Sequence, residues 1–361
     1  MSTVSDLLGA DFVCEQCGQR HKTRLKHLLF SRDALEHLPM LCREFAGVGG
    51  EITLVADTRT FSACGETAGE ILANAGFRVR PVIIPDPESG GLPVCDDCTR
   101  AMLEPRLGEP SMFLAVGSGV INDMVKWIAF DREIPYAVVA TAASMNGYAS
   151  DNIAPALKGV KRLLYGRGPV AILSTPVLLA SAPAEMTAAG LGDVLAKSVS
   201  AQDWRLNHHL FGEYFCPFCA NLINEIEPVY MDAPESIGAG EPEGLAALFE
   251  ALTLTGLAMT MAGTSAPASG GEHLVSHTID MMAMRDGIEH DFHGRQVGVG
   301  TILCTALYER VLAVTEPNLR ASAAEGVTDG QFWGRLTEPV ETEHVKKRAK
   351  TRQALEALAA P

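Results

Sequence analysis

The feature that most constrains the fold is a change of pattern near the middle of the chain. In the first half, short apolar segments that suit buried strands alternate with stretches of helical periodicity. The expected strands are Ile52–Ala56, Val79–Ile84, Met112–Val116, Tyr136–Ala140 and Val170–Leu173. Helices are expected between them, notably at Ser62–Ala75 and Val120–Phe130. Strands that alternate with helices indicate βαβ units and a parallel sheet with helices on its faces.

The second half has a different pattern, because the strand signals end after Pro183. The expected helices there are Ala184–Ser200, Gly244–Met261, Glu272–Met284 and Gln296–Leu312. We therefore expect an α/β protein with a Rossmann-like parallel-sheet domain over residues 1–180 and an all-helical domain over residues 181–361. Two domains also suit the length of 361 residues, since a single core usually stops growing near 250–300 residues.

The charge of the chain excludes some functions. The formal net charge is −15, from 44 acidic and 29 basic side chains. Such a surface repels phosphate backbones and anionic lipids, so we expect no nucleic-acid partner. No run of about 18 apolar residues is free of Pro, Gly or charge, and the N-terminus resembles no signal peptide. We therefore expect a cytoplasmic protein without a membrane span.

Six of the nine cysteines form three CxxC pairs, Cys14/Cys17, Cys95/Cys98 and Cys216/Cys219. An odd number of cysteines without a signal peptide favours reduced thiols over disulfides. The first two pairs supply four thiolates, which predicts a structural zinc held by Cys14, Cys17, Cys95 and Cys98. For the third pair, we expect buried reduced thiols that pack as small apolar side chains.

The segment FLAVGSGVINDMVKWIA indicates a phosphate-binding turn. An apolar strand ends in Gly117-Ser118-Gly119, and a helix follows directly. Glycines there let backbone N–H groups approach a pyrophosphate, while the helix dipole favours the anion. The alternative is a strand-to-helix turn that needs glycine only for its backbone angles.

Two further segments are candidates for cofactor contacts. Asp57 ends an early strand, where a carboxylate commonly binds the adenosine ribose and favours NAD over NADP; it could equally cap a helix. The loop ATAASMNGYAS carries Thr141, Ser144 and Ser150 after another strand, at the sheet edge where ligands gather. A polar loop with a hydroxyl helix cap is the alternative there.

A constellation in the second half suits a metal ion. Asp193 lies early on an expected helix, His273 and His277 are four residues apart on one helical face, and His290 and His293 follow. One carboxylate with two imidazoles is a sufficient set of ligands for a divalent catalytic metal with open positions.

These motifs, in this order, resemble the glycerol-1-phosphate dehydrogenases, within the superfamily of iron-containing alcohol dehydrogenases, glycerol dehydrogenases and dehydroquinate synthases. The resemblance spans about residues 50 to 310 and is carried by GSGVINDMVK, TAASMNGYAS, AGLGDVLAKSVSAQDW, GEYFCPFCA and ASGGEHLVSH. It implies an active site in the cleft between the two domains. It also implies NAD(H) or NADP(H), one Zn, Ni or Fe ion, and a homodimer or larger homo-oligomer.

The resemblance also implies roles for individual residues. The pyrophosphate would lie at Gly117, Ser118, Gly119, Val120 and Ile121, and other cofactor contacts would come from Thr141, Ser144 and Ser150. Asp193, His273 and His293 would bind the metal. Asp193 and His277 would be catalytic, and both would contact the substrate together with Asn146.

Three positions depart from the family pattern. Asn146 replaces a substrate-contacting aspartate, Ala266 replaces an arginine, and Ser174 stands where an aspartate is frequent. The cofactor and metal motifs are intact, so the resemblance identifies the type of reaction more closely than it identifies the substrate. The cations nearest by sequence for a substrate phosphate are Lys158, Lys161 and Arg162, which could also be a solvated basic stretch.

We therefore expect an oxidoreductase that interconverts sn-glycerol 1-phosphate and dihydroxyacetone phosphate, or a similar phosphorylated or phosphonate-bearing pair. A dehydroquinate-synthase-like lyase and a catalytically silent, zinc-stabilised binding protein are the alternatives.

Overall fold

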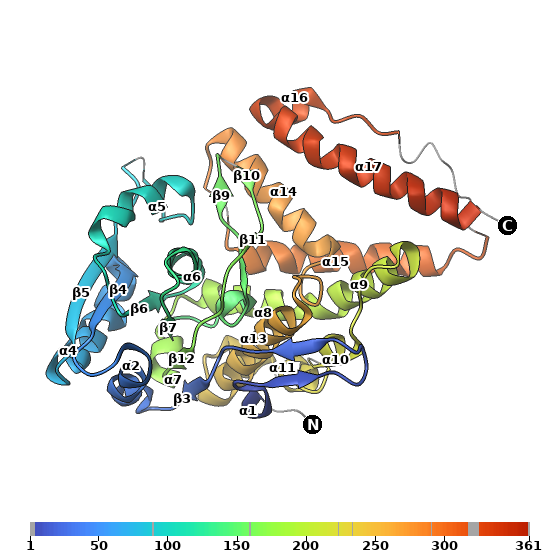
Figure 1. The fold of residues 1–361 in the computed structure, drawn as a ribbon. Helices are drawn as coiled ribbons and strands as arrows, with labels where there is room; N and C mark the ends of the chain where they lie inside the picture. The colour runs from blue at the N-terminus through green and yellow to red at the C-terminus, as the bar shows by residue number, and fades with distance from the viewer. Residues whose placement is uncertain are drawn as a thin grey trace.

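A six-stranded parallel sheet forms the centre of the first half of the protein (Figure 1). The computed structural model describes residues 4–88, 90–158, 160–222, 224–232, 234–289, 291–316 and 325–359. The strand order is β3-β12-β7-β6-β4-β5. The strands are β3 (His27–Phe30), β4 (Glu51–Asp57), β5 (Arg78–Ile84), β6 (Met112–Gly117), β7 (Tyr136–Ala140) and β12 (Ala171–Ser174). The α/β prediction is confirmed, whereas the edge strand β3 was not expected.

Helices cover both faces of this sheet because its central strands are apolar on both sides. Every residue of β6 and β7 is buried. Leu114 and Val139 pack in one cluster with α2 (Leu38–Ala46) and α4 (Glu66–Asn74). Phe113 and Val138 lie in the other cluster, with α6 (Gly119–Asp131). Further helices of this half are α3 (Thr58–Thr60), a π-helical turn (Phe61–Gly65), α5 (Asp97–Leu103) and α7 (Pro176–Ala180).

The second half is helical, as expected. Its helices are α8 (Ala184–Leu195), α9 (Lys197–Phe211), α10 (Pro217–Asn221), α11 (Glu227–Asp232), α12 (Pro234–Gly238), α13 (Pro242–Ala262), α14 (Gly271–Asp286), α15 (His293–Leu312), α16 (Gly330–Trp333) and α17 (Thr337–Ala359). By length and composition alone, helix α13 could cross a membrane, although Glu250 and Gly256 interrupt its apolar run. However, 78% of its most apolar window is buried, which is typical of a core helix.

Close helix contacts bring distant parts of the second half together. A Cβ atom on Gly294, at the start of α15, would lie 1.9 Å from the carbonyl oxygen of Ala189 on α8. Only a glycine permits this approach. Likewise, a Cβ atom on Gly190 would lie 1.9 Å from the carbonyl oxygen of Ala143. Helix α8 is therefore pressed against both α15 and the loop that follows β7.

The N-terminal segment does not lie in the parallel sheet. Helix α1 (Val4–Leu7) and the hairpin of β1 (Asp11–Val13) and β2 (Arg20–Lys22) contact α13 of the helical half (Figure 1). Two small antiparallel pairs, β8 (Asn152–Ile153) with β11 (Leu164–Tyr165) and β9 (Ala156–Leu157) with β10 (Val160–Lys161), extend from the loop after β7. The domain division at residues 180 and 181 stays a prediction.

Candidate active site

Asp193, His273 and His293 form a compact group of metal-ligating side chains. They come from α8, from α14 and from the first residue of α15, and their ligand atoms all lie within 4.8 Å of one another. Asp193 is 1% exposed and His273 is 5% exposed. The structure thus brings together the three residues that the sequence motifs indicated, because glycine contacts let α8 and α15 approach.

Hydrogen bonds to neighbouring residues orient both imidazoles. The Nδ1 atom of His273 lies 2.8 Å from Oε1 of Glu272. The Nδ1 atom of His293 lies 3.0 Å from the hydroxyl of Ser276, which donates its own proton to Oε1 of Gln296 at 2.9 Å. Since that hydroxyl donates to Gln296, it accepts from His293. These bonds use the Nδ1 atoms, and Nε2 of His273 faces Asp193, 3.5 Å from its Oδ1. A histidine held through one ring nitrogen by a neighbouring residue is common around metal sites. The donor set therefore fits a divalent cation.

The local charges keep the carboxylate of this group ionised. Burial by itself raises the pKa of Asp193, but the hydrogen bond with His273 and the charge of Lys197 outweigh burial and lower it to about 2. Burial lowers the pKa of His293 well below its ordinary value. The group thus offers one anionic oxygen and a neutral imidazole.

His277 lies beside this group without belonging to it. It is one turn beyond His273 on α14, and its ring stacks on that of His293 at 5.8 Å between centroids. Burial, followed by the charges of His273 and Lys161, lowers the pKa of His277 to about 3, so its ring is neutral near pH 7. Such a ring can donate or accept a hydrogen bond beside the metal group. His290 lies outside the described residues.

Asn146 contacts Asp193, a role that the sequence analysis missed. Its backbone N–H donates to Oδ2 of Asp193 at 2.7 Å, and its side-chain Nδ2 donates to Oδ1 at 3.0 Å. An aspartate at position 146 could not make the second bond because a carboxylate has no proton to donate. Asn146, in place of the family's aspartate, therefore adds a hydrogen bond to Asp193 of the metal-ligating group.

The loops after β6 and β7 meet at the expected cofactor site. The hydroxyls of Ser118 and Ser144 are hydrogen-bonded to each other, and Thr141 donates its backbone N–H to the carbonyl of Gly117 at 3.2 Å. A Cβ atom on Gly117 would lie 2.5 Å from the side chain of Ile121. Packing against Ile121 therefore also requires a glycine at this position.

Two other residues expected at the cofactor, Val120 and Ser150, differ in their surroundings. Val120 belongs to the first turn of α6, next to the Ser118–Ser144 contact. The Ser150 hydroxyl donates within its own loop, to the carbonyls of Gly147 and Asn152. The hydroxyl of Ser150 is therefore tied to the loop backbone.

Asp57 caps a helix in the structure. Its Oδ1 accepts the backbone N–H of Thr60 at 2.7 Å, and its Oδ2 lies 3.3 Å from Nη2 of Arg59. The guanidinium of Arg59 also forms two bonds to Asp86. A contact between Asp57 and a ribose stays a prediction.

Of the three cations considered for a phosphate, Lys161 lies closest to the histidines. Its Nζ is 3.9 Å from Oδ2 of Asp280, one turn beyond His277 on α14, and its charge lowers the pKa of His277. Arg162 is paired with Glu343 on α17 at 3.1 Å, and Lys158 is exposed.

The other two departures from the family pattern, Ser174 and Ala266, make different kinds of contact. The hydroxyl of Ser174 donates to the carbonyl of Ala140 at 2.7 Å, within the sheet. Ala266 packs against the apolar core. Lys126, a buried lysine at the end of the segment GSGVINDMVK, holds the loop after β7 through bonds of 2.8 Å to the carbonyls of Gly147 and Asn152.

The structure corrects the expected partners of the first CxxC pair. Cys14 and Cys17 lie with His21 and Cys216, whereas Cys95 and Cys98 are not in that group. Cys95 lies before α5, where its carbonyl accepts the backbone N–H of Ala156, and Cys98 is exposed. A two-residue spacing brings two thiols of one loop together, but it carries no information about which loops are neighbours.

Comparisons with known proteins identify relatives of this chain. The family model for iron-containing alcohol dehydrogenases matches residues 29–183. A protein of Halalkalibacterium halodurans named glycerol-1-phosphate dehydrogenase [NAD(P)+] is 34% identical over 300 residues, which are 82% of this chain and 74% of the relative. A protein of the same name from Geobacillus stearothermophilus is 30% identical over 351 residues, covering 96% and 83% of the two chains.

Solved structures show the same fold. A glycerol dehydrogenase from Schizosaccharomyces pombe superposes with a TM-score of 0.66 at 17% identity, covering 92% of this chain and 88% of the other. An iron-containing alcohol dehydrogenase from Thermotoga maritima gives 0.62 at 16% identity, covering 91% and 86%. From the sequence relatives and the shared fold, we conclude that this chain belongs to the glycerol-1-phosphate dehydrogenase family of the iron-containing alcohol dehydrogenases.

Proposed function

We propose that this protein is a metal-dependent, NAD(P)-linked dehydrogenase that interconverts sn-glycerol 1-phosphate and dihydroxyacetone phosphate. The observation that carries the proposal is the buried group of Asp193, His273 and His293, with both imidazoles oriented by outer hydrogen bonds. A catalytically silent binding protein would have no need for such a site. The names of the relatives support the same reaction.

Asp193, His273 and His293 would hold a Zn, Ni or Fe ion, all of which accept mixed nitrogen and oxygen ligands. When bound, such an ion acts as a Lewis acid that polarises a carbonyl oxygen. Asn146 keeps the carboxylate of Asp193 in place. The neutral ring of His277, which stacks on that of His293, would form a hydrogen bond with a reacting oxygen near the metal group.

The cofactor would lie along the turn from Gly117 to Ile121 at the N-terminus of α6. When bound, a nicotinamide cofactor supplies hydride transfer. The adjoining hydroxyls of Ser118 and Ser144 would face it. We propose that NADH is preferred over NADPH, because Asp57 repels a 2′-phosphate, although the neighbouring Arg59 weakens that repulsion.

The substrate phosphate would be bound by Lys161, whose charge acts on His277. The ion pair of Lys161 with Asp280, at 3.9 Å, is also longer than the pair of Arg162 with Glu343, at 3.1 Å. We also propose a cytoplasmic homodimer or larger homo-oligomer. Apolar side chains on α15 support an interface there, since Ile302 is 71% exposed and Leu312 is 80% exposed. Val299, Leu303 and Leu307, which lie four residues apart on the same helix, are also exposed. A contiguous apolar surface commonly marks a protein–protein interface.

The decisive experiment is a dehydrogenase assay of the enzyme reconstituted with each metal. Glycerol 1-phosphate, glycerol 3-phosphate, glycerol and phosphono-alcohols are compared with both cofactors. We expect net formation of NADH from glycerol 1-phosphate, with the highest kcat/KM of the series. Absence of net NADH formation with every alcohol would contradict the proposal and favour a lyase that retains its NAD.

A further inference from the structure

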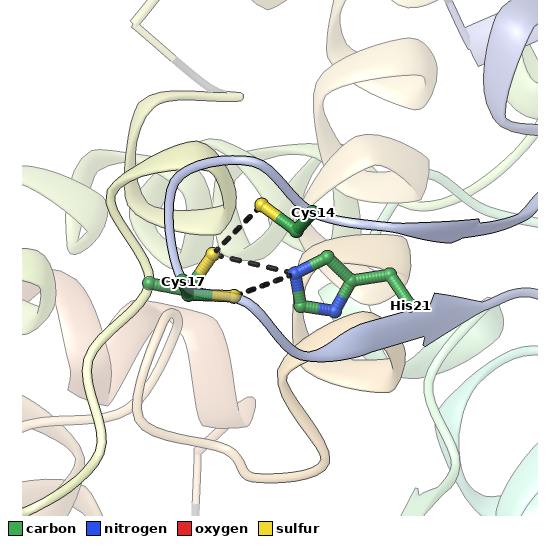
Figure 2. A group of neighbouring side chains, drawn as sticks. Cys14, Cys17 and His21 are labelled. Atoms are coloured by element: carbon green, nitrogen blue, oxygen red, sulfur yellow. Dashed lines mark hydrogen bonds between the residues drawn. The ribbon is translucent and has the colours of Figure 1, made fainter.

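A second cluster of metal-ligating side chains lies where the N-terminal hairpin meets the helical half. Cys14 and Cys17 lie at the tip of the β1–β2 hairpin, His21 is in β2, and Cys216 immediately precedes α10. Figure 2 shows Cys14, Cys17 and His21 converging. We propose that these four residues hold a structural zinc ion that fastens the hairpin to the helical half.

The distances within the cluster match a tetrahedral ion. Zn–S bonds of about 2.3 Å and Zn–N bonds of about 2.0–2.1 Å place tetrahedral ligand atoms roughly 3.5–3.8 Å apart. The Nε2 atom of His21 lies 3.4 Å from Sγ of Cys17 and 3.3 Å from Sγ of Cys216. The Sγ atoms of Cys14 and Cys216 are 3.9 Å apart. All four ligand atoms lie within 4.8 Å of one another.

The imidazole of His21 is oriented for a metal. Its Nδ1 atom lies 2.7 Å from the carbonyl oxygen of Met261, near the end of α13. A carbonyl can only accept, so Nδ1 carries the proton and Nε2 presents its lone pair to the thiols. A metal-ligating histidine usually donates its other N–H in this way. His21 is fully buried, so its ring nitrogens face protein atoms and not solvent.

The loop that carries the first two cysteines is shaped to place both thiols on one side. The backbone N–H of Gly18 donates to the carbonyl of Cys14 at 2.8 Å, and Gly18 has a φ of +70°. The N–H of Cys14 donates to the carbonyl of Gln19 at 2.9 Å. The hydroxyl of Tyr214 lies 3.3 Å from Sγ of Cys17, where it can donate to a thiolate.

Cys219 is a neighbour of this cluster rather than a ligand. Its Sγ is 3.8 Å from Nε2 of His21, but it does not belong to the group whose atoms are all within reach of one ion. A closed structural site needs four ligands, and Cys14, Cys17, His21 and Cys216 complete it.

A zinc ion here would stabilise the short β1–β2 hairpin. The strands β1 and β2 have three residues each, and an isolated two-stranded hairpin is marginally stable in water. The cluster joins Cys14 to a cysteine 202 residues further along the chain. Because such a site does not exist in the unfolded chain, the free energy of zinc binding becomes free energy of folding. The site shares no residue with the candidate active site, so its existence does not depend on the proposed dehydrogenase activity.

The test separates this zinc from the metal of the active site. The variant H273A/H293A removes two ligands of the active-site group, and its metal content is measured by mass spectrometry after purification. We expect about one zinc per chain, as a closed site of four ligands binds one ion. Adding C17S should remove this zinc, whereas adding C98S, the matched control in another CxxC pair, should not. Loss of zinc with C98S, or its retention with C17S, would overturn the assignment.

A second measurement does not depend on whether C17S folds. X-ray absorption on zinc-containing H273A/H293A should show three sulfur ligands at about 2.3 Å and one nitrogen at about 2.0–2.1 Å. Titration of the native wild type with a mercurial reagent should release this zinc as the thiols react. A folded H273A/H293A protein without zinc, or a spectrum with four sulfur ligands, would refute the proposed site.

Discussion

The contact between Asn146 and Asp193 gives a quantitative prediction for metal binding. Asn146→Ala removes the bond from Nδ2 to Oδ1, which is 3.0 Å long, and leaves the backbone bond of 2.7 Å in place. A hydrogen bond to a charged group contributes about 1.5–3 kcal/mol. Loss of a group that supports a metal ligand typically costs about tenfold to a hundredfold in affinity. We therefore expect metal affinity to fall by a factor within about 10–100, or about 1.4–2.8 kcal/mol.

The assay is a titration of the metal-free enzyme in chelator-buffered metal, followed by bound metal and by activity. Because Asn146 acts through Asp193, the main effect should be on the metal concentration that gives half-maximal activity. The control is Asn152→Ala, which removes an amide whose Nδ2 lies 3.9 Å from the sulfur of Met259. A dissociation constant for Asn146→Ala within about threefold of the wild type, well below the expected range, would refute the reasoning.

Three further predictions concern the site. His273→Ala should lower both bound metal at the active site and turnover, because it removes one of three ligands; elemental analysis and steady-state kinetics check this. Asp57→Asn keeps the helix cap but removes the charge, so the ratio of kcat/KM for NADH to that for NADPH should fall; an unchanged ratio would contradict a role in cofactor choice. Lys161→Met should raise KM for glycerol 1-phosphate about tenfold or more, the scale of a lost hydrogen bond between charged groups, while leaving KM for glycerol nearly unchanged. Lys158→Met, at an exposed lysine of the same loop, is the control, and an equal effect of both variants would count against Lys161.

Local pattern was sufficient for most of the fold. The five strands expected from apolar segments correspond to β4, β5, β6, β7 and β12, and three of the four helices expected in the second half correspond to α13, α14 and α15. The helix expected at Ala184–Ser200 is instead divided at Ala196 into α8 and α9, and α9 continues to Phe211. The edge strand β3 was missed because its four residues are only half-buried and carry little pattern. The close backbone contact at Gly294 could not be predicted from the sequence. Nothing in the sequence distinguishes a glycine in a loop from a glycine at a helix crossing.

The residues of the candidate site were also predicted only in part from the sequence. The residue types and spacing of Asp193, His273 and His293 indicated a metal, and the structure brings the three together. Ser276 and Gln296 were missed, although each lies three residues from a histidine on the same helix, where side chains share a face.

By itself, the sequence determined the periodic elements, the order of the motifs and the kinds of ligand that the chain can offer. These depend on interactions among residues close in the chain, which repeat every 2 residues in a strand and every 3.6 in a helix. The tertiary structure decided which distant groups meet: Asn146 with Asp193, Lys161 with Asp280, and Cys14 with Cys216 rather than with Cys95. Such meetings depend on how helices and loops pack, and packing is a property of the whole chain that no local spacing encodes.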